Sequence, residues 1–247
     1  MRYWLTSRRA ENPEQFDREV QVVCEAYQTA PELQAQNVHL VSTDEKTGIQ
    51  ALERAAPSLP MRPGEVERRE YRFAYKRHGT WALIANFEVA TGKVIRPSLG
   101  PTRTEEDFAA HVAQTVALDP EGTWIFIADQ LNTHQSASLV EWVARHCDLS
   151  VDLGEKGKHG VLKSQPSRAA FLQDPIHRIR FIYTPVHTSG LNQVEIWFSI
   201  LVRRLLKRGN FTSVEDLRQR ILAFVEYFNR TMAKPFKWTY AGRPLAA

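Results

Sequence analysis

Three acidic residues stand at the ends or starts of predicted elements, which makes them candidates for metal-dependent chemistry. Asp44 follows the apolar run VHLVST, Asp129 ends the run TWIFIAD, and Glu195 lies early in a helical segment that starts near residue 191. If the two apolar runs are parallel neighbouring strands, Asp44 and Asp129 emerge at the same sheet edge, where open α/β sheets bind ligands. Three carboxylates that meet there repel one another unless a divalent cation lies between them.

The ligand types favour a hard cation. Carboxylate oxygens without a surrounding His or Cys cluster are typical of Mg²⁺ or Mn²⁺ sites and disfavour zinc. Two such ions, about 3.5 to 4 Å apart, would activate a water or a 3′-hydroxyl and stabilise the leaving oxygen of a phosphodiester. The sequence therefore predicts metal-assisted phosphoryl transfer. The segment GEKGKHG lacks the spacing of a nucleotide-binding glycine loop, so a nucleoside triphosphatase is not indicated.

Each acid also has a purely structural interpretation. Asp44 and Asp129 each fit the first position of a turn, in DEKTG and DQLN. The segment Asn192 to Glu195 has the form of a capping box, in which Glu195 would reach back to the start of its helix. A capping role for Glu195 is compatible with a role in metal binding. Three acids that served only turns or a cap would have no reason to lie close together.

The order of elements indicates an α/β fold with a mixed sheet. Asn12 and Pro13 are typical of a helix start and predict a helix over 12–28. The remaining predicted elements are a strand at 38–43, an antiparallel meander of three strands at 71–77, 81–90 and 93–97 joined by HGT and TG, a helix over 104–118, a strand at 123–129, a helix over 136–147, a strand at 179–185, and helices from 191 and from 213. The polar segment 148–178 is too long for a connection and predicts an insertion or functional loop.

Composition and charge narrow the function classes. The 247 residues have a formal net charge of +4, and residues 196–247 carry ten Lys or Arg against three acids, which indicates a polyanionic partner. The two cysteines, Cys24 and Cys147, form no disulfide framework or zinc motif. No apolar run of membrane-spanning length and no secretory signal occurs, so we expect a cytoplasmic protein without a membrane partner.

Four segments together resemble a known family. They are STDEKTGIQALERAAPSLPMRPGEVERREY, WIFIADQLNTH, YTPVHTSGLNQVEIWFSIL and YFNRTMAKPFKWTYAGRPL. They resemble the catalytic domain of bacterial mariner-like insertion-sequence transposases of the DDE superfamily, over roughly residues 36–247. Gln130 stands where the family more often has Asn, and Gly190 stands where it usually has Trp.

The resemblance implies a fold, a cofactor and partners. The fold would be ribonuclease H-like, a mixed five-stranded sheet flanked by helices, in which Asp44, Asp129 and Glu195 bind two Mg²⁺ or Mn²⁺ ions and act in cleavage and joining of DNA. The partner would be double-stranded DNA, both element ends and target, bound by a homodimer associated with the nucleoid. Helix-turn-helix domains precede this domain in complete family members, so we expect residues 1–37 to be a helical lead-in and 38–247 to be the catalytic domain, with its insertion at about 148–178. A separate helix-turn-helix product or an intact transposase is then a further expected partner.

DNA contacts are expected from basic and polar side chains around the acids, because phosphate neutralisation dominates DNA affinity. Four of them continue the helix with Glu195, three precede or lie in the first run of the meander, and three lie in the insertion, where Arg168 is expected to help clamp the duplex. The expected DNA-binding residues are Arg68, Arg69, Lys76, Asn132, His134, Lys156, Lys158, Lys163, Arg203, Arg204, Lys207 and Arg208.

Two rival functions remain open at this point. One is a non-catalytic remnant that binds DNA or oligomerises and so modulates an intact transposase, an interpretation that Gly190 and the missing N-terminal domains favour and the three intact acids oppose. The other is a host nuclease of the same fold, such as a junction resolvase.

Overall fold

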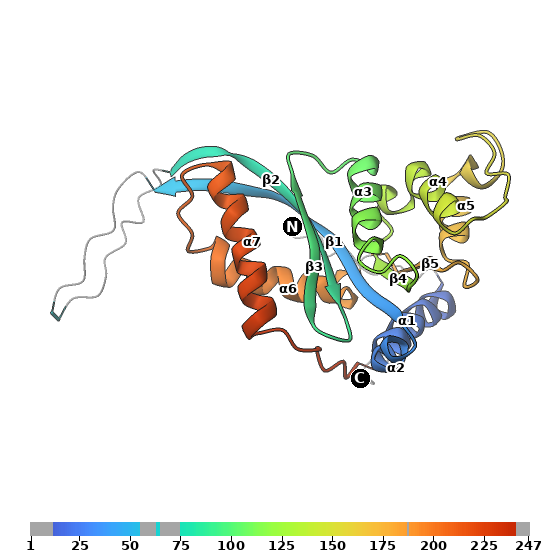
Figure 1. Ribbon diagram of the computed structural model, residues 1–247, viewed down its shortest axis with the longest axis horizontal. Coiled ribbons are helices and arrows are strands. Elements are labelled where there is room, and N and C mark those ends of the chain that lie inside the picture. The colour runs from blue at the N-terminus through green and yellow to red at the C-terminus, as the bar shows by residue number, and fades with distance from the viewer. Residues whose placement is uncertain (1–11, 55–62, 65–74, 187, 241–247) are drawn as a thin grey trace.

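The computed structural model describes residues 12–54, 63–64, 75–186 and 188–240. Its elements follow one another along the chain as shown in Figure 1. They are α1 (Pro13–Gln28), α2 (Ala30–Ala35), β1 (Val38–Arg54), β2 (Tyr75–Glu88), β3 (Lys93–Gly100), α3 (Glu105–Val116), β4 (Thr123–Ala128), η2 (Asn132–Gln135), α4 (Ala137–His146), η3 (Val161–Lys163), α5 (Gln165–Leu172), β5 (Ile179–Tyr183), η4 (Ser189–Leu191), α6 (Gln193–Leu201), the π-helical turn η5 (Val202–Leu206) and α7 (Val214–Thr231).

The described strands form one mixed sheet in the order β3-β2-β1-β4-β5. β1 pairs in parallel with β4, and β4 pairs in parallel with β5. β2 runs antiparallel to both β1 and β3. The predicted mixed five-stranded sheet flanked by helices is confirmed, and β1 joins its parallel half to its antiparallel half.

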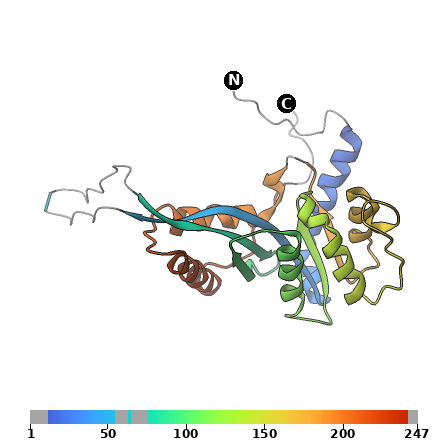
Figure 2. The ribbon, with the colours of Figure 1, turned by 90° about the horizontal axis from the view of Figure 1, so that it is seen from above.

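Successive side chains along each strand point to opposite faces of the sheet, and both faces are covered by a hydrophobic core. On one face, Val41, Phe126 and Phe181 pack with α3, α4 and α5. On the other face, Leu40 and Ile125 pack with α1. The antiparallel half of that second face packs with α6 and α7, which lie along the extended β1–β2 ribbon in Figure 2. Helices therefore cover both faces of the sheet where the β1–β4 pairing ends and β4 and β5 reach their carboxyl ends.

β1 continues well beyond the predicted strand at 38–43, so the turn expected at DEKTG is wrong. Pairing with β4 ends at Ser42, but pairing with β2 continues from Asp44 opposite Ala85 to Arg54 opposite Tyr75. Gly48, with a φ of 65°, lies in the irregularity between Lys46 and Ile49. A glycine at positive φ lets the strand pass a bulge without ending.

The predicted three-strand meander is also wrong in its first link. The segment HGT lies inside β2, whose register with β1 shifts between Gln50 and Leu52. Gly79, with a φ of 117°, absorbs this bulge. The runs 75–77 and 81–88 are thus one strand, and the rest of the first predicted run lies outside the described residues.

The predicted helices are confirmed, with the expected caps at most starts. Asn12 caps α1 through Gln15 N, and Thr104 forms a capping box with Asp107 at the start of α3. The segment 148–178 holds η3 and α5, and Leu162 and Leu172 from it are buried in the core of that face. Among the described helices, none combines the length and apolarity that crossing a bilayer requires.

Candidate active site

The structure brings Asp44, Asp129 and Glu195 together in one cleft. Asp44 lies in β1 two residues past the end of its parallel pairing with β4, and Asp129 directly follows β4. Glu195 lies in the first turn of α6. All three line a cleft of about 690 Å³ at the carboxyl ends of the parallel strands. The expected convergence of the three acids therefore occurs, even though Asp44 lies within a strand and not at its end.

Both oxygens of Asp44 are held in place. Oδ1 accepts a hydrogen bond from Glu45 N at 2.7 Å, and Oδ2 accepts one from Asn192 Nδ2 at 3.1 Å. Burial, and next the negative charge of Asp129, raise the pKa of Asp44 to about 7. A carboxylate with this pKa is only partly ionised at neutral pH, and a nearby cation would restore its charge.

The surroundings of the Asp129 carboxylate differ from those of Asp44. Its Oδ1 lies 2.7 Å from His134 Nδ1 and accepts a hydrogen bond from Leu131 N at 3.0 Å. Burial raises the pKa of Asp129, but the hydrogen bond from His134 and its positive charge outweigh burial and hold the pKa below its usual value. The side chain is 45% exposed, so the carboxylate stays charged and opens onto the cleft.

The predicted capping box at Glu195 is wrong. Asn192 is the N-cap residue of α6, but its side chain makes no capping hydrogen bond, and its backbone N–H bonds Ser189 O instead of Glu195. Glu195 is half-buried and lines the cleft, and its charge is close enough to raise the pKa of Asp44 further. The Glu195 carboxylate is therefore not engaged as a cap.

The side chain of Asn192 fastens α6 to β1. Its Oδ1 accepts a short hydrogen bond from Ser42 Oγ, and its Nδ2 donates to Thr43 O at 3.1 Å as well as to Asp44. Ser42 Oγ in turn accepts a hydrogen bond from Val194 N at 2.9 Å. These contacts fix the helix that carries Glu195 against the strand that carries Asp44.

Tyr27 of α1 holds the same helix start from another side. Its hydroxyl donates to Leu191 O at 2.8 Å and accepts from Gln193 N at 3.2 Å. Tyr27 is buried, and the ring of Trp238 contacts it at a centroid distance of 4.7 Å. Sequence reasoning missed both Tyr27 and Asn192 as determinants of the site.

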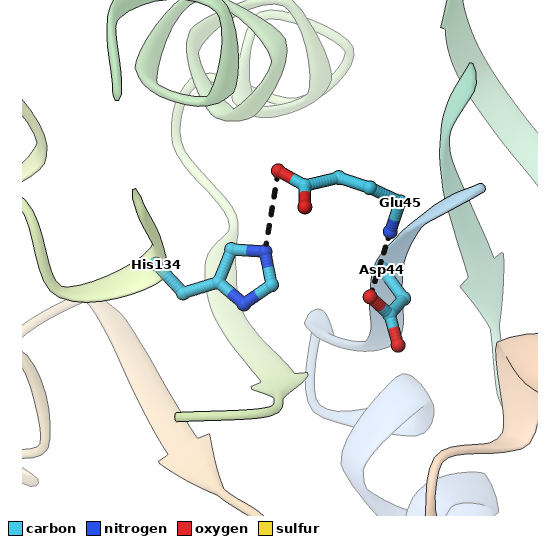
Figure 3. A group of neighbouring side chains, drawn as sticks. All are labelled: Asp44, Glu45 and His134. Atoms are coloured by element: carbon cyan, nitrogen blue, oxygen red, sulfur yellow. Dashed lines mark hydrogen bonds and ion pairs between the residues drawn. The ribbon is translucent and has the colours of Figure 1, made fainter. Parts of the chain in front are cut away.

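Two further charged residues, Glu45 and His134, lie close to Asp44 (Figure 3). Glu45 and His134 lie 3.6 Å apart between Oε1 and Nε2, with side chains 1% and 0% exposed. Burial lowers the pKa of His134, but its close contact with Asp129 and its ion pair with Glu45 outweigh burial and raise the pKa to about 9. Because His134 is fully buried, its predicted contact with DNA is wrong. Glu45 was not among the predicted site residues, and only its place next to Asp44 pointed to it.

Arg103 is the fourth site residue that sequence reasoning missed. Its guanidinium lies 3.5 Å from Glu45 Oε2, and its side chain is 48% exposed where it lines the cleft. It precedes α3 in TRTEED, where no local signal distinguishes it from an ordinary surface arginine. Arg103 is the one lysine or arginine among the described residues that line the cleft.

Most of the predicted DNA-binding residues are exposed. Lys156 and Lys158 form surface ion pairs with Glu105 and Glu155, and exposed Asn132 accepts a hydrogen bond from Arg168. The others exposed are Lys76, Lys163, Arg203, Arg204, Lys207 and Arg208. Arg68 and Arg69 lie outside the described residues.

One expected DNA contact and the two departures from the family pattern can be placed in the structure. Arg168, expected to help clamp DNA, is buried and donates to Gln135 O at 2.6 Å, so this expectation is wrong. Gln130 lines the cleft, and its side chain donates to Thr184 O at 3.1 Å. A Cβ at Gly190 would meet no atom within 4 Å, so the space there is open.

A family model described as DDE superfamily endonuclease matches residues 39–218, a span that contains all three acids. The chain belongs to this family. Comparison with curated protein sequences gave no match. Membership of the DDE superfamily, expected from the sequence motifs, is therefore confirmed by a match that covers most of the chain.

Solved structures of a mariner transposase share the fold. The Mos1 transposase paired-end complex with the left transposon end has a TM-score of 0.54 and 13% identity, over 98% of this chain and 61% of that chain. The Mos1 transposase catalytic domain with Raltegravir and Mn has a TM-score of 0.52 and 11% identity, over 98% and 90%. The predicted ribonuclease H-like fold is confirmed, and this chain spans less than two thirds of the transposase in the first of these structures.

Asp44, Asp129 and Glu195 offer donors that suit a divalent cation, and the ligand atoms that lie within 4.8 Å of one another among the described residues are those of Asp44, Glu45 and His134. The three carboxylates contribute only oxygen donors. Burial and the charge of Asp129 raise the pKa of Asp44, whereas the hydrogen bond and positive charge of His134 outweigh burial and hold the pKa of Asp129 below its usual value. His134, the histidine nearest the cleft acids in the described chain, already bonds Asp129. An oxygen-only set of this kind suits Mg²⁺ or Mn²⁺.

Proposed function

We propose that this chain is the catalytic domain of a DNA transposase, which cleaves and joins phosphodiesters at the ends of an insertion sequence. The observation that carries the proposal is the convergence of Asp44, Asp129 and Glu195 in one cleft of about 690 Å³. Membership of the DDE superfamily endonuclease family supports it, because the matched span includes the three acids.

Asp44, Asp129 and Glu195 would hold two Mg²⁺ or Mn²⁺ ions. Such ions activate an attacking water or 3′-hydroxyl and stabilise the leaving oxygen. The chain's own residues prepare the ligands: Glu45 N and Asn192 Nδ2 orient Asp44, while His134 occupies one oxygen of Asp129. Preorganised ligands of this kind avoid the cost of ordering them during the reaction.

Positively charged residues inside the cleft and on the surface beside it would bind the DNA. Arg103, half exposed in the cleft, is placed to bind the oxygens of the phosphate that is cut. The exposed residues Arg203, Arg204, Lys207 and Arg208, which continue from α6, would neutralise phosphates on either side. The expected substrate is double-stranded DNA, with both element ends and target bound by a homodimer associated with the nucleoid.

We also propose the division of the chain expected from its sequence. Residues 1–37 would be a helical lead-in to the catalytic domain at 38–247, with an insertion at about 148–178. A separate helix-turn-helix product or an intact transposase would supply recognition of the element ends.

A nicking assay tests the function. Supercoiled plasmid or element-end DNA is incubated with the protein and Mg²⁺ or Mn²⁺, and wild type is compared with Asp129→Asn. Wild type is expected to nick the DNA and Asp129→Asn to leave it intact, because the amide keeps the shape but removes the charge. The matched control is Asp148→Asn, an exposed aspartate after α4, which is expected to cleave like wild type. Equal cleavage by wild type and Asp129→Asn would contradict the proposal.

The rival interpretation, a non-catalytic remnant that modulates an intact transposase, predicts DNA binding without cleavage in Mn²⁺. The placement of all three acids on one cleft favours the catalytic interpretation.

A further inference from the structure

Glu45 and Asp44 are adjacent in β1 and therefore point to opposite faces of the sheet. Asp44 faces α6 and bonds Asn192, whereas Glu45 faces the side of α3 and lies against His134 and Arg103. The Glu45 side chain is 1% exposed. A carboxylate buried to this degree is costly unless cations compensate it, and here His134 and Arg103 do so.

His134 is fixed on every side. The centroid of its ring lies 4.3 Å from that of Phe108. Its backbone is held as well: the carbonyl O accepts a hydrogen bond from Tyr183 Oη at 2.7 Å, and the backbone N–H donates to Leu131 O at 3.0 Å. One ring nitrogen faces Glu45 and the other faces Asp129. The imidazole therefore has no alternative orientation that keeps both contacts.

We propose that Glu45 and His134 are positioning residues, which together fix the carboxylate of Asp129 so that Oδ1 is bonded to His134 and Oδ2 is presented to the cation. This inference rests on the proposed function, because it concerns the same metal-binding cleft. The Nδ1–H of His134 supplies the bond to Asp129, and Glu45 holds the opposite nitrogen so that the ring cannot turn. Partners behind metal ligands commonly change metal affinity by about 10 to 100-fold.

In a competing arrangement, Glu45 and His134 would be direct ligands of the cation. Ligand atoms of Asp44, Glu45 and His134 all lie within 4.8 Å of one another, so a cation bound directly by these three is the competing arrangement. It would need His134 Nε2 as a ligand, because Nδ1 already lies at 2.7 Å from Asp129. The burial of Glu45 and His134 behind Asp44 and Asp129 favours positioning over direct binding.

Two substitutions at His134 separate these roles. In His134→Asn the amide nitrogen stands near the position of Nδ1 and keeps the bond to Asp129, whereas in His134→Gln it stands near Nε2 and loses that bond. The measurement is the Kd for Mn²⁺ alone, from the electron paramagnetic resonance signal of free Mn²⁺, with far-UV circular dichroism and thermal unfolding to confirm the fold. Positioning predicts a Kd within about threefold of wild type for His134→Asn and about 10 to 100-fold weaker binding for His134→Gln.

Other outcomes overturn the proposal. Direct binding through Nε2 predicts the reverse order, with His134→Asn the weaker binder, and a role in folding alone predicts equal loss in both. His111→Gln is the matched control, because His111 is also fully buried but bonds Ser98 at 2.7 Å and contacts none of the acids; its Kd for Mn²⁺ is expected to equal that of wild type. Glu45→Gln removes the charge that holds the ring and is expected to weaken Mn²⁺ binding by about tenfold; unchanged binding in this variant overturns the part assigned to Glu45.

The test separates this inference from the proposed function. Binding of Mn²⁺ by wild type without any DNA cleavage would remove the function and leave the positioning result standing. Cleavage by wild type, together with wild-type Mn²⁺ affinity in His134→Gln, would remove the positioning role and leave the function standing.

Discussion

Asn192 Nδ2 donates a hydrogen bond to Asp44 Oδ2 across 3.1 Å, and the two residues lie 148 positions apart in the chain. The same nitrogen bonds Thr43 O, and the same side chain accepts from Ser42. Asn192 therefore connects the strand that carries one acid of the cleft to the helix that carries another. The relative placement of Asp44 and Glu195 depends on this side chain.

Asn192→Ala is expected to lower both stability and metal affinity. The substitution leaves the buried Ser42 hydroxyl and Thr43 carbonyl without their partner, a loss of about 1 to 3 kcal/mol in the free energy of unfolding. The Kd for Mn²⁺ is expected to rise by about tenfold or more, because α6 is released from β1. Urea unfolding and Mn²⁺ titration measure the two effects.

Ser199→Ala, on the exposed face of α6, is the control for Asn192→Ala and is expected to change the free energy of unfolding by less than about 0.5 kcal/mol. An Asn192→Ala protein with wild-type Mn²⁺ affinity would show that the hydrogen bonds of Asn192 do not position the acids.

Tyr27→Phe is expected to damage the cleft from outside the family-matched span of 39–218. It deletes the hydroxyl that bonds Leu191 O and Gln193 N at the start of α6, with an expected loss of about 1 to 3 kcal/mol in the free energy of unfolding. DNA cleavage is expected to slow as well, because Glu195 lies two residues further along. Tyr227→Phe, at a half-exposed position in α7, is expected to change neither quantity; equal behaviour of the two variants would contradict the role of Tyr27.

Much of this arrangement was predictable from local sequence, and the rest depended on pairing between distant segments. Asp129 and Glu195 were found because an acid directly after a buried apolar strand and an acid in a first helical turn are local signals. The convergence of Asp44 with them also held, because parallel pairing with β4 ends at Ser42. The continuation of β1 past Asp44 was missed because it depends on β2, whose pairing residues lie about 20 to 50 positions away.

The errors at Asn192 and His134 have the same origin. The pattern from Asn192 to Glu195 fits a capping box, but contacts with Ser42 and Thr43, about 150 positions away, take up the Asn192 side chain. His134 follows Asp129 closely and so resembles a loop residue facing DNA, whereas packing against Phe108 and Tyr183 buries it. A buried charge network has no short sequence signature, so Glu45 and Arg103 were not found.

Arg103→Ala is expected to weaken DNA binding more than metal binding. Its guanidinium is a half-exposed positive charge in the cleft, so its loss is expected to raise the KM for DNA and to reduce the slope of log affinity against log salt by about one. The Kd for Mn²⁺ is expected to change by less than about threefold. Arg145→Ala, an exposed arginine at the end of α4, is the control. An unchanged salt slope in Arg103→Ala would contradict a phosphate contact.

His111 is expected to make stability depend on pH. Burial, and next the charge of His134, lower the pKa of His111 to about 3, whereas an unfolded histidine has a pKa of about 6.5. The unfolded state therefore binds a proton first, so this contribution to stability is complete above pH 6.5 and is lost as the pH falls from 6.5 toward 3. Its loss is expected to reach about 1.4 kcal/mol per pH unit.

Urea unfolding at several pH values between 7.5 and 4.5 measures this effect. His111→Gln does not titrate and is expected to lose stability less steeply than wild type below pH 6.5. Parallel curves for the two proteins would contradict the neutral, buried state of His111.

The location of bound Mn²⁺ tests the central claim most directly, and anomalous diffraction from crystals soaked in Mn²⁺ measures it. We predict anomalous peaks inside the cleft, at about 2.0 to 2.4 Å from carboxylate oxygens of Asp44, Asp129 and Glu195. Peaks confined to other acids, or a cleft without any peak at saturating Mn²⁺, would contradict it.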